Sequence, residues 1–115
     1  MENKLVLQSS DSSISSVQIL LQTTDGFVIG RSDSRSSFIP DIDLADFKAL
    51  EKGVSRRHAV FVRYQDKIHI LDINSINGTF LNGKRLKPDI PYMITTGDQL
   101  GFGDLLLSVT FEQQP

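Results

Sequence analysis

Arg31, Ser55 and Asn77 are polar residues at the ends of short apolar segments, far apart along the chain. A guanidinium presents a planar fork of N–H donors to two oxygens of a phosphate, and a serine hydroxyl donates a short hydrogen bond to a third. A side-chain amide both donates and accepts, so Asn77 suits the main chain of an extended peptide. These residue types together predict reversible binding of a phosphate carried by a peptide.

The residues that follow Ser55 leave a second chemistry open. Arg56 and Arg57 come next, and if a strand has begun there, their side chains point to opposite faces. Only one of them then reaches the phosphate, and we favour Arg56. His58 lies three residues after Ser55, and a serine and a histidine are two of the residues that a small Ser/His hydrolase needs. No acidic residue that would orient the histidine is evident. We therefore predict no catalytic residue and no enzyme activity.

The elements that must position these residues read as short strands. Val17, Ile19 and Leu21 are apolar residues at every second position, and so are Leu105, Leu107, Val109 and Phe111. The expected strands are Lys4 to Gln8, Val17 to Thr23, Phe27 to Gly30, His58 to Tyr64, Lys67 to Ile73, Thr79 to Leu81 and Leu105 to Phe111. Many short strands with closely spaced turns predict an all-β fold, with a two-sheet sandwich as first choice.

Turn residues support that reading. Asn82-Gly83 separates residues 79–81 from 84–86, where two positive φ angles make a tight type I′ hairpin. Asp25-Gly26 and Gln65-Asp66 separate two further strand pairs. In a sandwich, the loops at one end converge, so Arg31, Ser55 and Asn77 can face one another.

Two stretches depart from the strand pattern. Residues 9–16 contain six serines among eight residues, which predicts a hairpin loop that buries little surface. Residues 31–54 form an unusually long connection, and long irregular loops are often functional. Within the second, residues 43–53 are compatible with a turn or two of helix, with Asp43 as N-cap and Gly53 just past the end.

Length and composition predict one domain, residues 1–115. The chain is 39% hydrophobic, carries a net charge of -2 and has no cysteine. No overall positive field favours nucleic acid or an anionic membrane, and no apolar run is long enough to span a bilayer. Two isolated histidines make no metal site. We expect no metal, no cofactor and a cytoplasmic protein.

Several separated motifs occur in an order that resembles the forkhead-associated (FHA) domain over residues 4–112. They are Gly30-Arg31, Ser55-Arg56-Arg57-His58, Asn77 to Gly83, Gly97-Asp98 and Phe102-Gly103. The stretches Pro40 to Leu44 and Gly53 to Ala59 look like those of bacterial members. The resemblance implies a sandwich of about eleven strands whose loops at one end bind phosphothreonine peptides.

The resemblance also implies a role for each motif residue. Arg31 and Ser55 hold the phosphate, and Arg56 joins them. Asn77 bonds the peptide main chain, and His58 is a buried histidine that braces the loops. Gly30 and Gly78 shape the loops around these residues.

Two positions depart from the family pattern. Ile76 replaces a threonine, serine or basic residue that contacts the phosphate in many members, so only its backbone amide can help bind the peptide. Asn74 stands where glycine is common, and asparagine tolerates the left-handed conformation that such a turn needs.

The leading functional prediction is a phosphothreonine-binding signalling module. Its partner is a protein phosphorylated by a Ser/Thr kinase, with no nucleic acid and no membrane insertion. The first alternative is a scaffold on the same fold that associates with itself or with a partner independently of phosphate, to which Ile76 gives weight. The remote alternative is the Ser55/His58 hydrolase.

Overall fold

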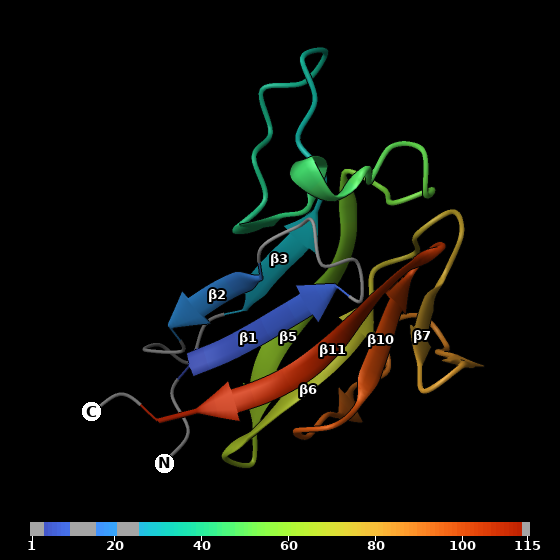
Figure 1. Ribbon diagram of the computed structural model, residues 1–115. Helices are drawn as coiled ribbons and strands as arrows, with labels where there is room; N and C mark the ends of the chain where they lie inside the picture. The colour runs from blue at the N-terminus through green and yellow to red at the C-terminus, as the bar shows by residue number, and fades with distance from the viewer. Residues whose placement is uncertain (1–3, 10–15, 21–25, 114–115) are drawn as a thin grey trace.

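The computed structural model describes residues 4–9, 16–20 and 26–113. Within these ranges the chain forms eleven strands and one short 3-10 helix, arranged as two stacked sheets (Figure 1). The predicted all-β sandwich is therefore confirmed. No helix among the described residues is long and apolar enough to cross a membrane.

The first sheet has six strands in the order β2-β1-β11-β10-β7-β8. Their bounds are β1 Lys4–Ser9, β2 Val17–Leu20, β7 Thr79–Leu81, β8 Lys84–Arg85, β10 Gln99–Phe102 and β11 Leu105–Glu112. β1 and β11 pair antiparallel over six residues, from Lys4 opposite Glu112 to Ser9 opposite Leu107. This pairing joins the two ends of the described chain.

The second sheet has five strands in the order β4-β3-β5-β6-β9. They span β3 Phe27–Gly30, β4 Ile42–Asp43, β5 Arg57–Tyr64, β6 Lys67–Asp72 and β9 Tyr92–Met93. β3 runs antiparallel to β5 and parallel to β4, and the β3–β5 register shifts between Ile29 and Gly30. That shift falls where Arg31 leaves the sheet.

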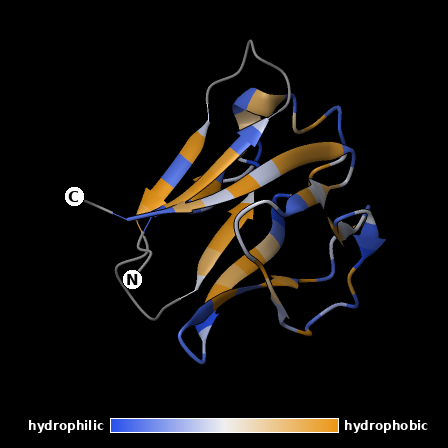
Figure 2. Cartoon of the chain, turned by 60° about the horizontal axis from the view of Figure 1, so that its bottom comes forward, coloured by the Kyte–Doolittle hydropathy of each residue, from blue (hydrophilic) through white to orange (hydrophobic). Residues whose placement is uncertain are grey.

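The core lies between the sheets, and its side chains come from alternate strand positions. Leu105, Leu107 and Val109 of β11 are buried, while the residues between them are exposed. Phe61 and Ile70 are fully buried from the opposite sheet. Most of the hydrophobic residues lie in the strands, and most of the loops are polar (Figure 2).

The turns follow the residues that the sequence places there. Asn82 and Gly83 have φ angles of 52° and 85°, which confirms the predicted type I′ hairpin between β7 and β8. Gln65 and Asp66, at 51° and 62°, make the same kind of turn without a glycine.

Three predictions need correction. β4, β9 and β10 were not among the expected strands. The connection 31–54 is not wholly irregular, because it contains β4 and the 3-10 helix η1, Ala45–Phe47. The helix expected over 43–53 is shorter than predicted, since it is confined to η1 and Lys48 follows it at φ 57°.

Burial explains this last difference. Leu44, Phe47 and Ala49 are all buried, and a single tight turn places these apolar side chains in the core. Asp43 belongs to β4, although its carboxylate still accepts a hydrogen bond from Ala45 N, 3.0 Å away. The predicted serine-rich loop, 9–16, lies outside the described residues except for Ser9 and Ser16.

Candidate functional site

Three loops meet at one end of the sandwich, which we call the apical end: residues 31–41, 44–56 and 73–78 (Figure 1). Hydrogen bonds join the loops, and one of them is between backbone atoms, from Arg31 N to Arg56 O at 3.1 Å. Ile76 N donates to Ser55 Oγ at 3.3 Å, and Asn77 Nδ2 donates to Gly53 O at 3.0 Å. The structure thus brings together the residues that the sequence singled out.

Gly30 allows the first two loops to approach. A Cβ atom at this position would lie 1.9 Å from Arg56 O and 2.9 Å from Ser55 O. Real Cβ atoms do not come this close to backbone atoms, so any side chain here would push the loops apart. The glycine before Arg31 is therefore a requirement of packing.

The Arg31 side chain is held by two acceptors. Its Nε donates to Val54 O at 2.9 Å, and its Nη1 donates to Asp33 Oδ2 at 2.7 Å. The side chain is only 13% exposed, so most of it is covered by the loops. A guanidinium fixed in this way loses little freedom when an anion binds.

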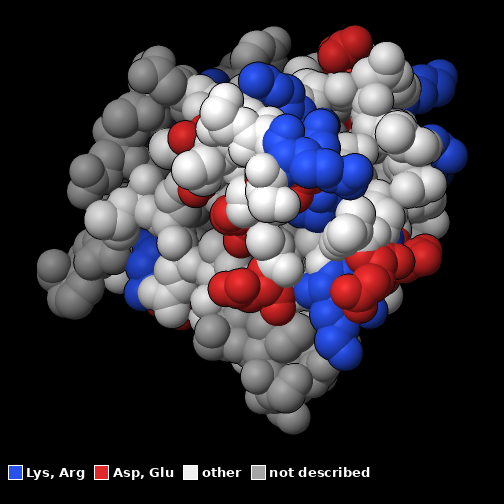
Figure 3. All heavy atoms as spheres, turned by 90° about the horizontal axis from the view of Figure 1, so that it is seen from above, with Lys and Arg blue, Asp and Glu red and all other residues white. Residues whose placement is uncertain are grey.

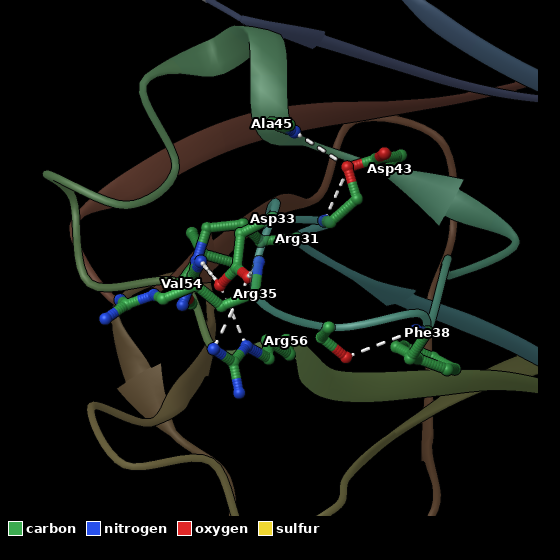
Figure 4. Close-up of polar contacts among 10 residues, drawn as sticks. Arg31, Asp33, Arg35, Phe38, Asp43, Ala45, Val54 and Arg56 are labelled. Atoms are coloured by element: carbon green, nitrogen blue, oxygen red, sulfur yellow. Dashed lines mark hydrogen bonds and ion pairs between the residues drawn. The ribbon is translucent and has the colours of Figure 1, made fainter.

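Arg56 meets the same carboxylate from the other side. Its Nε lies 2.8 Å from Asp33 Oδ2 and its Nη2 lies 3.4 Å from Oδ1 (Figure 4). Asp33 is thus shared by both arginines, with 16% of its side chain exposed against 43% for Arg56. Hydrogen bonds from Arg56 and then Arg31 hold the pKa of the Asp33 carboxyl well below its ordinary value.

Ser55 is positioned by His58. Ser55 N donates to His58 Nδ1 at 3.0 Å, so the ring hydrogen sits on Nε2, which donates to Gly78 O at 2.8 Å. His58 is fully buried and packs edge-on against Phe102. Burial lowers its pKa below the ordinary 6.5. A neutral ring therefore links the loops of Ser55 and Gly78.

The Ser55 hydroxyl oxygen accepts a hydrogen bond from Ile76 N, so the hydroxyl hydrogen of Ser55 points away from Ile76. Among the described residues no acceptor is found for that hydrogen. A hydroxyl in this state is available to donate to an oxyanion beside it. Ser55 Oγ makes no hydrogen bond to His58 in the described structure, because His58 Nδ1 is bonded to the Ser55 amide.

Buried polar groups support the loop 73–78. Asp72, 2% exposed, accepts hydrogen bonds from Ser75 Oγ, from Thr79 Oγ1 at 2.7 Å and from Asn74 N at 3.1 Å. Ser75 Oγ in turn accepts from Gly78 N at 3.1 Å. Asn74 has φ 68°, which confirms the left-handed turn expected there.

The tip of this loop carries Ile76 and Asn77. The Ile76 side chain is 84% exposed, while its amide is engaged with Ser55. Asn77 is exposed and donates one amide hydrogen to Gly53 O, and among the described residues its side-chain oxygen accepts no hydrogen bond. Gly53, at φ 82°, makes room for it, because a Cβ there would lie 2.6 Å from Asn77 Nδ2.

Two further arginines lie outside the Asp33 group. Arg57 begins β5 and lies over the Phe38 ring, 3.8 Å from its centroid. Arg85 lies beside Gly78, where a Cβ would come within 2.8 Å of its Nε. Viewed onto the apical end, Lys and Arg side chains gather near the middle of the face, with acidic side chains around them (Figure 3).

Sequence reasoning missed Asp33. The available signal was an acidic residue two positions after Arg31 and two positions before Arg35. It also missed that a backbone carbonyl, Val54 O, holds Arg31. Neither contact can be read from residue types, because each depends on how the loops fold back on one another.

Two stacked sheets with polar loops gathered at one end place the chain in the class of β-sandwiches. The FHA domain model matches residues 27–103. The chain therefore belongs to the FHA domain family.

Relatives of this chain come from eukaryotes and bacteria. The nuclear inhibitor of protein phosphatase 1 from Homo sapiens is 33% identical over 75 residues, 64% of this chain and 21% of that protein. Protein FraH from Nostoc sp. is 38% identical over 80 residues, 68% of this chain and 27% of that protein. The chain thus spans only about a quarter of the length of these relatives.

Solved structures agree on the fold. The FhaA FHA domain, solved in complex with the intracellular domain of another protein, is 26% identical with a TM-score of 0.66. That match covers 91% of this chain and 98% of the other. An FHA domain from Chlamydia trachomatis is 20% identical with a TM-score of 0.69, covering 93% and 96%.

Proposed function

We propose that the apical end binds phosphothreonine in an extended segment of a partner protein. The observation that carries the proposal is the pairing of Arg31 and Arg56 on one carboxylate, beside a serine hydroxyl whose hydrogen is free to donate. Two guanidiniums and a hydroxyl match the three terminal oxygens of a phosphate monoester. Membership of the FHA family supports the same ligand.

The residues divide the work of binding. Arg31, Ser55 and Arg56 contact the phosphate, while Asn77 hydrogen-bonds the peptide main chain with its free carbonyl oxygen. Ile76, exposed at the loop tip, lies against the peptide beside the phosphorylated residue. Gly30, His58 and Gly78 hold the loops at the spacing that these contacts need.

Such a site suits a reversible signal. Each charge-assisted hydrogen bond contributes roughly 1.5 to 3 kcal/mol, and ordering and association offset much of the total. Dissociation constants in the micromolar range are then expected, so that a Ser/Thr kinase writes the mark and a phosphatase erases it. The chain acts as a binding module, and its partner is a phosphoprotein.

One alternative has a specific observation in its favour. Ile39, Leu50 and Ile76 are 73%, 62% and 84% exposed on the apical loops. Large exposed apolar side chains on the loops at one end of a domain are compatible with a protein contact there. A phosphate-independent scaffold that uses this end is the second candidate function.

Calorimetry separates the two candidates. One peptide is titrated with threonine, phosphothreonine or phosphoserine at the same position, against the wild-type protein and Arg31→Ala. We expect binding of the phosphothreonine form only, or far above the others, and its loss in Arg31→Ala with the circular dichroism spectrum unchanged. Lys67→Ala, at the opposite end of β5 and β6, is the matched control and should bind as wild type.

Equal affinity for the plain and phosphorylated peptides would reject the proposal and favour the scaffold. The pH dependence gives a second measure. The second ionisation of a phosphate monoester lies near pH 6, so affinity should fall as the pH drops below about 6. Affinity independent of both pH and salt would likewise favour the scaffold.

A further inference from the structure

Asp33 is held in place by the backbone of its own loop. Its Oδ1 accepts from Arg35 N at 2.8 Å, and its carbonyl oxygen accepts from Ser36 N at 3.3 Å. Both contacts belong to a tight turn over residues 33–36 and need neither Arg31 nor Arg56. The position of the carboxylate is therefore set by the loop, and the arginines are placed relative to it.

The contacts with Asp33 leave both guanidiniums with donors to spare. A guanidinium has five N–H groups. In Arg56 two of them, on Nε and Nη2, face the carboxylate. In Arg31 one is on Val54 O and one on Asp33. The Nη1–Nη2 end of Arg56 and part of that of Arg31 remain for a ligand, so an anion can bind while Asp33 stays.

Exposure orders these groups from the inside outward. Asp33 and Arg31 have side chains that are 16% and 13% exposed, whereas Arg56 is 43% exposed. An anion arriving from solvent meets Arg56 first, and the Asp33 carboxylate lies between the two guanidiniums (Figure 4). Two neighbouring guanidiniums also repel each other, and the carboxylate between them offsets this repulsion.

We propose that Asp33 is a positioning residue that locks Arg31 and Arg56 together as one preformed phosphate fork and stays in place when the phosphate binds. This inference rests on the proposed function, because it assigns the fork to the phosphate. It makes Asp33 part of the binding site although a carboxylate repels the ligand.

Removing the Asp33 charge has two opposing effects on affinity. The arginines lose their anchor, so binding must order one or two long side chains, which weakens it. The phosphate dianion also loses a repulsive neighbour, which strengthens binding. Salt screens the second effect and leaves the first unchanged. The contribution of positioning is therefore measured at high salt.

The test uses Asp33→Asn, which keeps an oxygen to accept from Arg35 N, and Asp33→Ala. Asp46→Asn is the matched control, because it removes a negative charge from an exposed residue of η1 that, among the described residues, makes no ion pair or hydrogen bond with either arginine. Affinity for the phosphothreonine peptide is measured by calorimetry at low salt and at about 0.5 M sodium chloride, where the Debye length is roughly 4 Å.

At high salt we expect Asp33→Asn and Asp33→Ala to bind about ten-fold more weakly than wild type, the order expected for one or two long side chains that must be fixed. Asp46→Asn should bind as wild type. Arg56→Ala should lower peptide affinity much more when Asp33 is present than when it is combined with Asp33→Asn, since Asp33 and Arg56 act as a unit. Additive losses, or tighter binding by Asp33→Asn at high salt, would overturn the proposal.

A ligand-free measurement separates this inference from the proposed function. In nitrogen-15 spectra of wild type, the Arg31 and Arg56 Nε–H signals should be resolved and slow to exchange, and in Asp33→Asn the Arg56 signal should broaden or exchange rapidly. If these signals behave as expected while the peptide shows no phosphate preference, the fork exists and the proposed function fails. If the protein prefers the phosphorylated peptide but the Arg56 signal is the same in wild type and Asp33→Asn, the positioning role is wrong.

Discussion

Gly30→Ala tests whether close approach of two backbones builds the site. The added Cβ would lie 1.9 Å from Arg56 O and 2.7 Å from its carbonyl carbon, where ordinary contact begins at 3.4 Å. β3 and the loop before β5 must therefore separate by roughly 1.5 Å. The hydrogen bond from Arg31 N to Arg56 O, now 3.1 Å, would break.

The expected cost follows from these two changes. Overpacking costs about 1 to 3 kcal/mol and the lost hydrogen bond about 1 kcal/mol. The free energy of unfolding should fall by about 2 to 4 kcal/mol, which lowers Tm by about 10 to 25 °C in a domain of this size. Binding of the phosphothreonine peptide should be lost as well, because Arg31 and Arg56 would no longer share Asp33.

Urea unfolding followed by circular dichroism measures this effect, with Gly97→Ala as the matched control. Gly97 has φ 98°, and a Cβ added there would meet no atom within 4 Å, so alanine costs only the left-handed backbone, about 1 to 2 kcal/mol. A Gly30→Ala protein that is no less stable than Gly97→Ala, or that still binds the phosphopeptide, would refute the role of close approach.

Two further predictions concern the buried groups beneath the loops. Because burial lowers the pKa of His58 in the folded protein, the unfolded chain binds a proton more readily. The stability that comes from a neutral His58 is thus complete above about pH 6.5 and is lost as the pH falls toward the pKa of His58 in the folded protein. Urea unfolding at several pH values measures this loss. A free energy of unfolding that stays constant between about pH 5 and 7 would contradict the prediction. Asp72→Asn should lower the free energy of unfolding by about 2 to 4 kcal/mol. The reason is that an amide nitrogen would replace an oxygen that accepts a hydrogen bond from Ser75, Thr79 or Asn74. Thermal unfolding checks this, and an unchanged Tm would show that these hydrogen bonds add little to stability.

β6 and β11 could be predicted because burial on one face leaves an alternating pattern along most of each strand. β3 and β7 have the predicted bounds, and β11 extends one residue further. β4 and β9 have only two residues each, too few for a pattern. β10 reads Gln-Leu-Gly-Phe with three consecutive buried residues, so alternation is absent, and Gly101 lowers its strand propensity. These strands exist because neighbouring strands supply their partners.

The site was predictable where topology alone decides position. Arg31, Ser55 and Asn77 follow or precede strands, and strand order brings such ends together. Side-chain partners are a different matter, because a contact such as that between Asp33 and Arg56 spans 23 residues. Nothing in the sequence states how a long loop folds back, so the shared carboxylate could only be found in the structure.

The structure also changes the meaning of Ile76, one of the two positions at which this chain departs from the FHA family pattern. The amide of residue 76, rather than its side chain, contacts Ser55 Oγ. Every residue except proline supplies that amide. The spacing between Ser55 and the 73–78 loop is fixed from below by His58, which bonds one loop at each ring nitrogen. At the proposed phosphate site Ile76 therefore offers no side-chain donor but leaves Ser55 positioned, so that Arg31 and Arg56 at Asp33 would supply most of the positive charge.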